Sequence, residues 1–123
     1  MSNTLKETHA AALASIIEMV ARLNEPDTEE EAREEIENDA LSVEVRSSWH
    51  AVGDTDSKPD EYRILVTTGG PAVQIVGNLN QYGEPENARL QVQDWFKPWT
   101  EFPTSTEEDE ALETYARCFY FGE

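Results

Sequence analysis

Apolar residues recur at steps of three and four near the start of the chain, which predicts an amphipathic helix. These positions are Leu5, His9, Ala12, Leu13, Ile16, Val20 and Leu23. Pro26 disfavours helical backbone at the residue before it, so this helix should end near Asn24.

A second helix should follow at once, with Asp27 or Thr28 as its N-cap, because the carboxylates that come next complement the helix dipole. It should end near Glu37 or Asn38. Its apolar positions, mainly Ala32 and Ile36, form only a narrow stripe.

The period changes to two after residue 40. Apolar and small residues alternate with more polar ones, which predicts a strand with one buried face; the inward positions are Leu41, Val43, Val45, Ser47 and Trp49. Residues 62–68 and 72–79 are rich in β-branched side chains and flank Gly69-Gly70-Pro71, a pattern typical of a hairpin. A fourth strand is expected over 89–96, and Pro98 should end it.

A last helix is expected after Pro103. Thr104, Ser105 and Thr106 are its candidate N-caps, and acidic residues fill the first turn. The order of helix, helix, four strands and helix predicts an α+β fold with a four-stranded antiparallel meander, one face of which is covered by the first and last helices. We expect a single domain over residues 1–123, because this length suits one hydrophobic core.

The charge balance narrows the classes of partner. The chain carries 26 Asp and Glu against 9 Lys and Arg, a formal net charge of −17. Direct nucleic-acid binding is not expected, because phosphates are neutralised by clustered Lys or Arg. Anionic membranes are disfavoured for the same reason. A basic partner surface fits this charge, and so does solubility alone.

The expected cellular location and the expected lack of catalytic activity both rest on features that the sequence does not contain. No run of about 18 apolar residues indicates a membrane span, and the first residues do not have the pattern of a signal peptide. A single Cys118 agrees with a reducing cytoplasm. His9, His50 and Cys118 lie in three different elements, so no metal site, cofactor site or catalytic constellation is expected. We therefore expect a cytoplasmic protein that is not an enzyme.

Acidic residues gather in two segments. Residues 25–39 contain nine carboxylates and one arginine, a net charge of −8. Carboxylates on successive helical turns lie about 5 to 6 Å apart, close enough together to imitate phosphates along a nucleic-acid strand. The candidate partner-binding residues here are Glu29, Glu30, Glu31, Glu34, Glu35, Glu37 and Asp39, and a second patch comprises Glu107, Glu108, Asp109 and Glu110.

Three interpretations of this acidity stay open. The glutamates can form a plain solvated helix face, they can mimic a nucleic acid, or they can reflect adaptation to high salt, which the scarcity of lysine would suit. Like charges four residues apart, as in Glu30 and Glu34, destabilise a helix slightly, so stability alone does not favour this choice.

Aromatic residues are dense over 95–102, where Trp95, Phe96, Trp99 and Phe102 lie close together. Such a group either caps the open end of the sheet or leaves Trp95 or Trp99 exposed as an anchor for a partner.

The segments Gly69-Gly70-Pro71, Ile75-Val76-Gly77, Gly83-Glu84-Pro85, Gln93–Phe96 and Pro98–Phe102 together resemble parts of small uncharacterised proteins of phages, prophages and plasmids. The resemblance covers about a third of the chain and carries over no functional residues. It implies a mobile-element protein, a class in which small acidic proteins often inhibit host defence as anti-CRISPR or anti-restriction proteins.

Two functions follow as hypotheses. The first is a non-enzymatic inhibitor that acts in the host cytoplasm and places its acidic face in the nucleic-acid channel of a basic host complex. The alternative is an acidic dimeric chaperone for secretion or assembly, which holds an extended client protein against its sheet. The chain can be a monomer or a homodimer, with a monomer favouring the first function and a dimer with an exposed apolar groove favouring the second.

Overall fold

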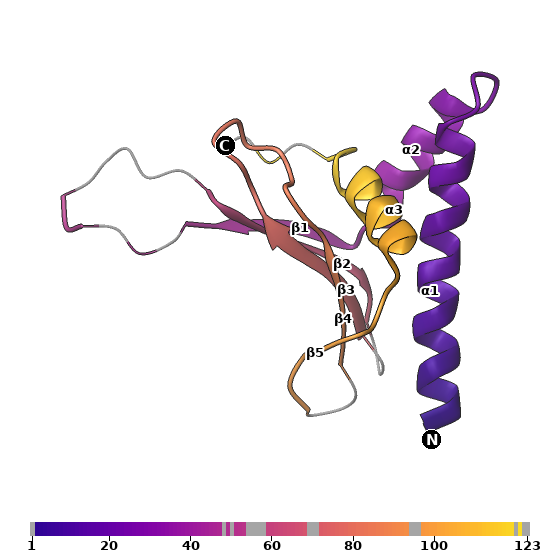
Figure 1. Ribbon diagram of the computed structural model, residues 1–123, viewed down its shortest axis with the longest axis horizontal. Helices are drawn as coiled ribbons and strands as arrows, with labels where there is room; N and C mark the ends of the chain where they lie inside the picture. The colour runs from indigo at the N-terminus through magenta and orange to yellow at the C-terminus, as the bar shows by residue number, and fades with distance from the viewer. Residues whose placement is uncertain are drawn as a thin grey trace.

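The computed structural model describes residues 2–47, 49, 51–53, 59–68, 72–93, 97–119 and 121, with backbone alone for 2–9. The elements are α1 (Ser2–Leu23), α2 (Glu29–Asp39), β1 (Ser42–Arg46), β2 (Glu61–Thr67), β3 (Ala72–Asn78), β4 (Arg89–Gln93), β5 (Thr100–Glu101) and α3 (Thr106–Ala116). Adjacent strands pair antiparallel in chain order, as a meander. The predicted α+β class, with two N-terminal helices and a C-terminal helix, is confirmed (Figure 1). The predicted hairpin turn Gly69-Gly70-Pro71 lies outside the described residues.

The strand count differs from the prediction, because the sheet has five strands and not four. The fifth strand, β5, follows Pro98 and pairs antiparallel with β4 through Gln91↔Glu101 and Val92↔Thr100. The backbone N–H of Phe102 then donates to the carbonyl of Leu90 at 2.8 Å. A strand of two residues is too short to show a period of two, so its sequence carries no signal for it.

The helices lie together on one side of the sheet, and the core lies between the two layers (Figure 1). Side chains of β2, β3 and β4 supply the sheet half of this core: Tyr62, Ile64, Val73, Ile75 and Leu90. The helices supply the other half, with Leu13, Ile16, Met19, Ile36, Leu112 and Tyr115. Both α2 and α3 pack against α1.

The edge strand β1 departs from the predicted burial. Val43 and Val45 face the same side of the sheet as Ile64 and Tyr62, their partners on β2, yet each is 38% exposed. Leu41, just before the strand, is 56% exposed. The prediction of a buried face for this strand is wrong, because the helical layer covers the middle strands and β1 runs away from the helices (Figure 1).

Candidate functional site

Two buried residues of α2, Ala32 and Ile36, face α1 and the core and so fix which side of the helix is exposed. At 100° per residue, Glu30, Glu34 and Glu37 fall on the opposite side of the helix. All three are exposed. From Glu30 to Glu37 is seven residue steps, or about 10 Å along the helix axis. We call these three residues the acidic stripe.

Of the other carboxylates of α2, Glu31 is exposed, whereas Glu35 and Glu29 have partners within the chain. Glu35 accepts two hydrogen bonds from the Arg22 guanidinium, at 3.0 and 2.6 Å, which ties α2 to α1. The hydrogen bond from Arg22 lowers the pKa of Glu35 below its usual value. Glu29 lies 4.0 Å from Arg33, one turn along the same helix.

Asp39 also has a structural contact. The buried hydroxyl of Tyr115 on α3 donates to Asp39 Oδ2 at 2.6 Å. Burial raises the pKa of Tyr115, and the hydrogen bond to Asp39 raises it further. Asp39 and Glu35 therefore tie α2 to other helices, and Glu29 pairs only within α2. No ion pair or side-chain hydrogen bond within the described residues involves the acidic stripe.

Thr28 holds the predicted N-cap position of α2 without the predicted kind of bond. Its side chain makes no capping hydrogen bond to α2. The hydroxyl instead donates to the carbonyl of Arg22 at 2.7 Å and so closes the end of α1. The charge of Glu29, Glu30 and Glu31 in the first turn still complements the helix dipole.

The second acidic patch serves partly as a helix start. Ser105 caps α3, its hydroxyl accepts from the N–H of Glu108 at 3.2 Å, and the Glu108 carboxylate accepts from the N–H of Ser105 at 2.8 Å. The hydroxyl of Thr104 hydrogen-bonds to Asp109. Glu107 and Glu110 are exposed. Of the predicted patch, these last two have the carboxylates most available to a partner.

The two acidic patches do not form one stripe. The hydrogen bond from Tyr115 to Asp39 joins the C-terminal parts of α3 and α2. From there the helices diverge, so the acidic first turn of α2 and that of α3 lie at different places along the helical layer (Figure 1).

The predicted aromatic anchors have different outcomes. Trp95 lies outside the described residues. Trp99 is half-buried, and Phe102 packs against the core.

The aromatic side chains most exposed within the described residues are Trp49, at 102%, and Tyr82, at 77%. The prediction that Trp49 faces inward is wrong, because β1 ends at Arg46 and the alternation does not continue to Trp49. Tyr82 lies in the turn before Gly83, where exposed side chains are common.

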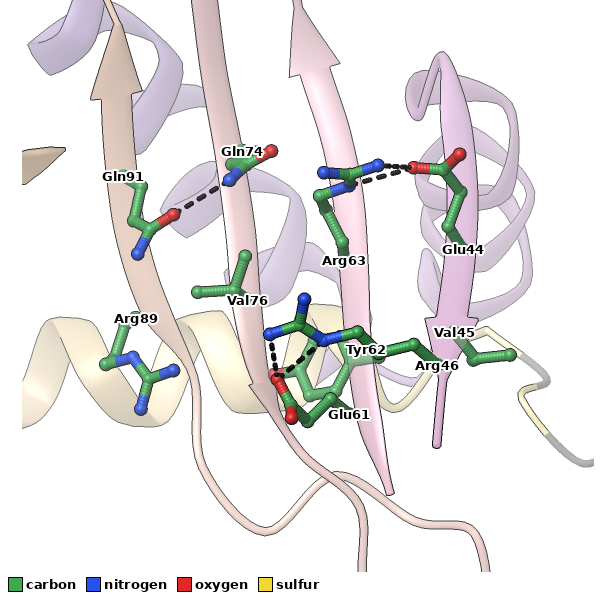
Figure 2. Close-up of a pocket in the computed structure, with 10 residues that line it drawn as sticks. All are labelled: Glu44, Val45, Arg46, Glu61, Tyr62, Arg63, Gln74, Val76, Arg89 and Gln91. Carbon is green, nitrogen blue, oxygen red and sulfur yellow. Dashed lines mark hydrogen bonds and ion pairs between the residues drawn. The ribbon is translucent and has the colours of Figure 1, made fainter. Parts of the chain in front are cut away.

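The outer face of the sheet carries a hollow of about 270 Å³. Figure 2 shows it lined by side chains that pair across neighbouring strands. Arg63 binds Glu44, Arg46 lies 2.9 Å from Glu61, and Gln74 donates to Gln91 at 2.8 Å. Arg89 also lines the hollow and makes none of these contacts. Most of the charge on this face is therefore neutralised within the sheet.

Candidate metal ligands and nucleophiles are few in the part of the chain that the structure describes. Within it, no three His, Cys, Asp or Glu residues are placed to hold a metal ion. Cys118 is half-buried, and burial raises the pKa of its thiol. None of the helices described has the length and apolar character to cross a membrane. The side chains of His9 and His50 lie outside the described residues.

No protein-family model, curated protein or solved structure matches this chain. The resemblance to proteins of mobile elements therefore stays a prediction.

Proposed function

We propose that this protein is a non-enzymatic inhibitor that docks the acidic stripe of α2 into a cationic groove of a nucleic-acid-binding partner. The observation that carries the proposal is that the carboxylates of α2 include two groups, one bound to other helices and one exposed on the surface. Glu35 and Asp39 are bound to other helices, whereas Glu30, Glu34 and Glu37 are exposed on the side away from the core.

The charge of the stripe is not needed to fold the helix. Glu30 and Glu34 are one turn apart, and a pair of like charges at this spacing costs about 0.2 to 0.5 kcal/mol. A row of carboxylates held on successive turns instead suits a groove whose Arg and Lys side chains are spaced for phosphates. Long-range attraction between such surfaces gives fast association that weakens as salt rises. A host defence complex as the target follows from the resemblance to mobile-element proteins.

The experiment is affinity capture from a host lysate with tagged protein, at low and at moderate salt, followed by mass spectrometry. We expect a basic nucleic-acid-binding complex that is lost as salt rises and is displaced by added DNA. The triple variant Glu30→Gln/Glu34→Gln/Glu37→Gln should fail to capture it.

The matched control is Glu84→Gln/Glu86→Gln/Glu101→Gln, three exposed carboxylates outside the helices. It removes the same charge and should still capture the complex. If both triple variants lost the complex equally, binding would depend only on total charge. If both still captured the complex, the acidic stripe would have no role in binding.

A dimeric chaperone is the second candidate function, because apolar side chains are exposed on β1. In that case an extended segment of a client protein would pair with this strand, and its capture would survive high salt. The neutralised hollow of the outer sheet face offers such a client little apolar surface (Figure 2).

A further inference from the structure

The exposed apolar side chains are concentrated in one stretch of the chain. Of the seven large apolar side chains that are exposed among the described residues, two are Ile17 and Tyr82. The other five belong to β1 and its flanking residues: Leu41, Val43, Val45, Trp49 and Val52. Single exposed apolar residues are ordinary, but Val43 and Val45 lie on the same face of β1 and form a contiguous group, which marks an interaction surface.

The edge of β1 lacks several of the usual protections. In the described sheet β1 pairs only with β2, so its other edge has no partner strand. Natural edge strands are blunted by lysine, proline, a bulge or an inward-pointing charge. Ser42–Arg46 contains no lysine or proline, and its pairing with β2 is regular. Its two charges, Glu44 and Arg46, lie on the outer face and bind Arg63 and Glu61 (Figure 2).

Local charge indicates what pairs with this edge. Glu44 and Arg46 are the only Asp, Glu, Lys or Arg residues in positions 40–53, so this stretch is neutral in a chain of net charge −17. A basic partner is drawn to the acid elsewhere on the molecule. At this edge, a second copy of the chain can approach without placing like charges opposite one another.

The geometry points to a homodimer formed by antiparallel pairing of β1 with β1 of a second copy, with the two-fold axis at Val43. A two-fold axis perpendicular to the sheet gives antiparallel strands and keeps the helices of both copies on one side. Leu41 then lies opposite Val45 of the second copy, and Ser42 opposite Glu44. The apolar side chains of both copies cover one another on the side that the helical layer leaves open.

The two registers displaced by two residues are less favourable. With the axis at Glu44, this residue would lie opposite Glu44 of the second copy, and like charges directly opposite across strands are destabilising. With the axis at Ser42, Val45 would lie opposite Asp39, which belongs to α2 and not to the strand. The axis at Val43 avoids both arrangements and puts the Ser42 hydroxyl where it can donate to the Glu44 carboxylate.

Disulfide trapping tests this register directly. Directly opposed residues in antiparallel strands have Cα atoms about 4.5 to 5.5 Å apart, within the range that a disulfide spans. In a Cys118→Ser background, Val43→Cys should form a cross-linked dimer under mild oxidation. Tyr82→Cys, at an exposed site outside the strand, is the control for random collision. Cross-linking of Val43→Cys no faster than the control, or of Glu44→Cys in its place, would overturn the proposal.

Molar mass in solution provides the second test. Sedimentation equilibrium of the wild-type chain should show a dimer that becomes tighter as salt rises, because salt screens the repulsion between two acidic chains. Val43→Glu should weaken the dimer at least about tenfold by placing two carboxylates opposite one another at the axis of the interface, while Tyr82→Glu leaves it unchanged. Circular dichroism shows whether each variant is folded. A monomeric wild-type chain, with or without a client strand bound at this edge, would refute the homodimer.

Discussion

The hydrogen bond between Tyr115 and Asp39 tests whether Asp39, one of the acidic residues of α2, stabilises the fold. The phenol is fully buried, and its hydroxyl lies 2.6 Å from Asp39 Oδ2. A hydrogen bond to a charged group contributes about 1.5 to 3 kcal/mol. Asp39 is only half-buried, so water can hydrate it when the phenol is removed, and the loss should fall at the lower end of this range.

We therefore expect Tyr115→Phe to lower the free energy of unfolding by about 1 to 2 kcal/mol. Urea denaturation of the wild type, Tyr115→Phe, Asp39→Ala and the double variant completes a double-mutant cycle. The coupling energy should be about 1 to 2 kcal/mol, and Glu37→Gln, on the acidic stripe, should change stability by less than about 0.5 kcal/mol. A coupling below about 0.5 kcal/mol would refute a structural role for Asp39.

The pH dependence of this contact has a definite sign. Burial and the hydrogen bond to Asp39 raise the pKa of Tyr115, so the folded protein holds this proton more tightly than the unfolded chain. The stabilisation is complete below the usual phenol pKa of about 10 and is lost as pH rises above it. In Tyr115→Phe the decline of stability in this alkaline range should be smaller.

Three further outcomes follow from the structure. Gly77→Ala should cost about 3 kcal/mol in a thermal or urea melt, because a Cβ at this position would lie 2.2 Å from the carbonyl oxygen of Asn87. Ser105→Ala should cost about 1 kcal/mol by the same measurement, since it removes the cap of α3. The lowered pKa of Glu35 means that its bond to Arg22 stabilises the fold above the usual glutamate pKa and is lost as pH falls. Arg22→Gln should therefore show a smaller drop in the urea midpoint between pH 6 and about pH 3.

The helices and most strands were predictable because their signals are local. A period of 3.6 marks α1 through Ile16 and Val20, and these residues are buried in the structure. The cap of α3 is an equally local signal, which leaves Thr104, Ser105 and Thr106 as candidates, and the structure selects Ser105. Local signals of this kind survive folding because the surrounding structure agrees with them.

The exposure of β1 was not predictable from its alternation. A period of two shows which residues share a face, but not whether another layer covers that face. The thin apolar content of α2 was the available clue. With only Ala32 and Ile36 buried, this helix packs on α1 and has no apolar side chains left to cover Val43 and Val45.

The candidate site was predictable as a region and not residue by residue. Nine carboxylates in fifteen positions locate the acidic segment, but sequence alone gives Glu35 and Glu34 equal standing. What separates them is a residue distant in sequence, Arg22, whose guanidinium reaches one and not the other. Long-range pairs of this kind depend on how α1 and α2 pack, which no local pattern encodes.

The proposed inhibitor surface and the proposed dimer edge are compatible because they differ in charge and in place. The acidic stripe lies on α2, on the side away from the core, whereas β1 runs away from the helices (Figure 1). Pairing through β1 covers apolar side chains and leaves both acidic stripes exposed, so one dimer presents two of them. Salt should tighten the dimer and weaken binding through the stripe. If both salt dependences are measured on one protein, their opposite signs assign dimerisation to β1 and partner binding to the acidic stripe. Val43→Glu should weaken the dimer without abolishing the binding of the partner.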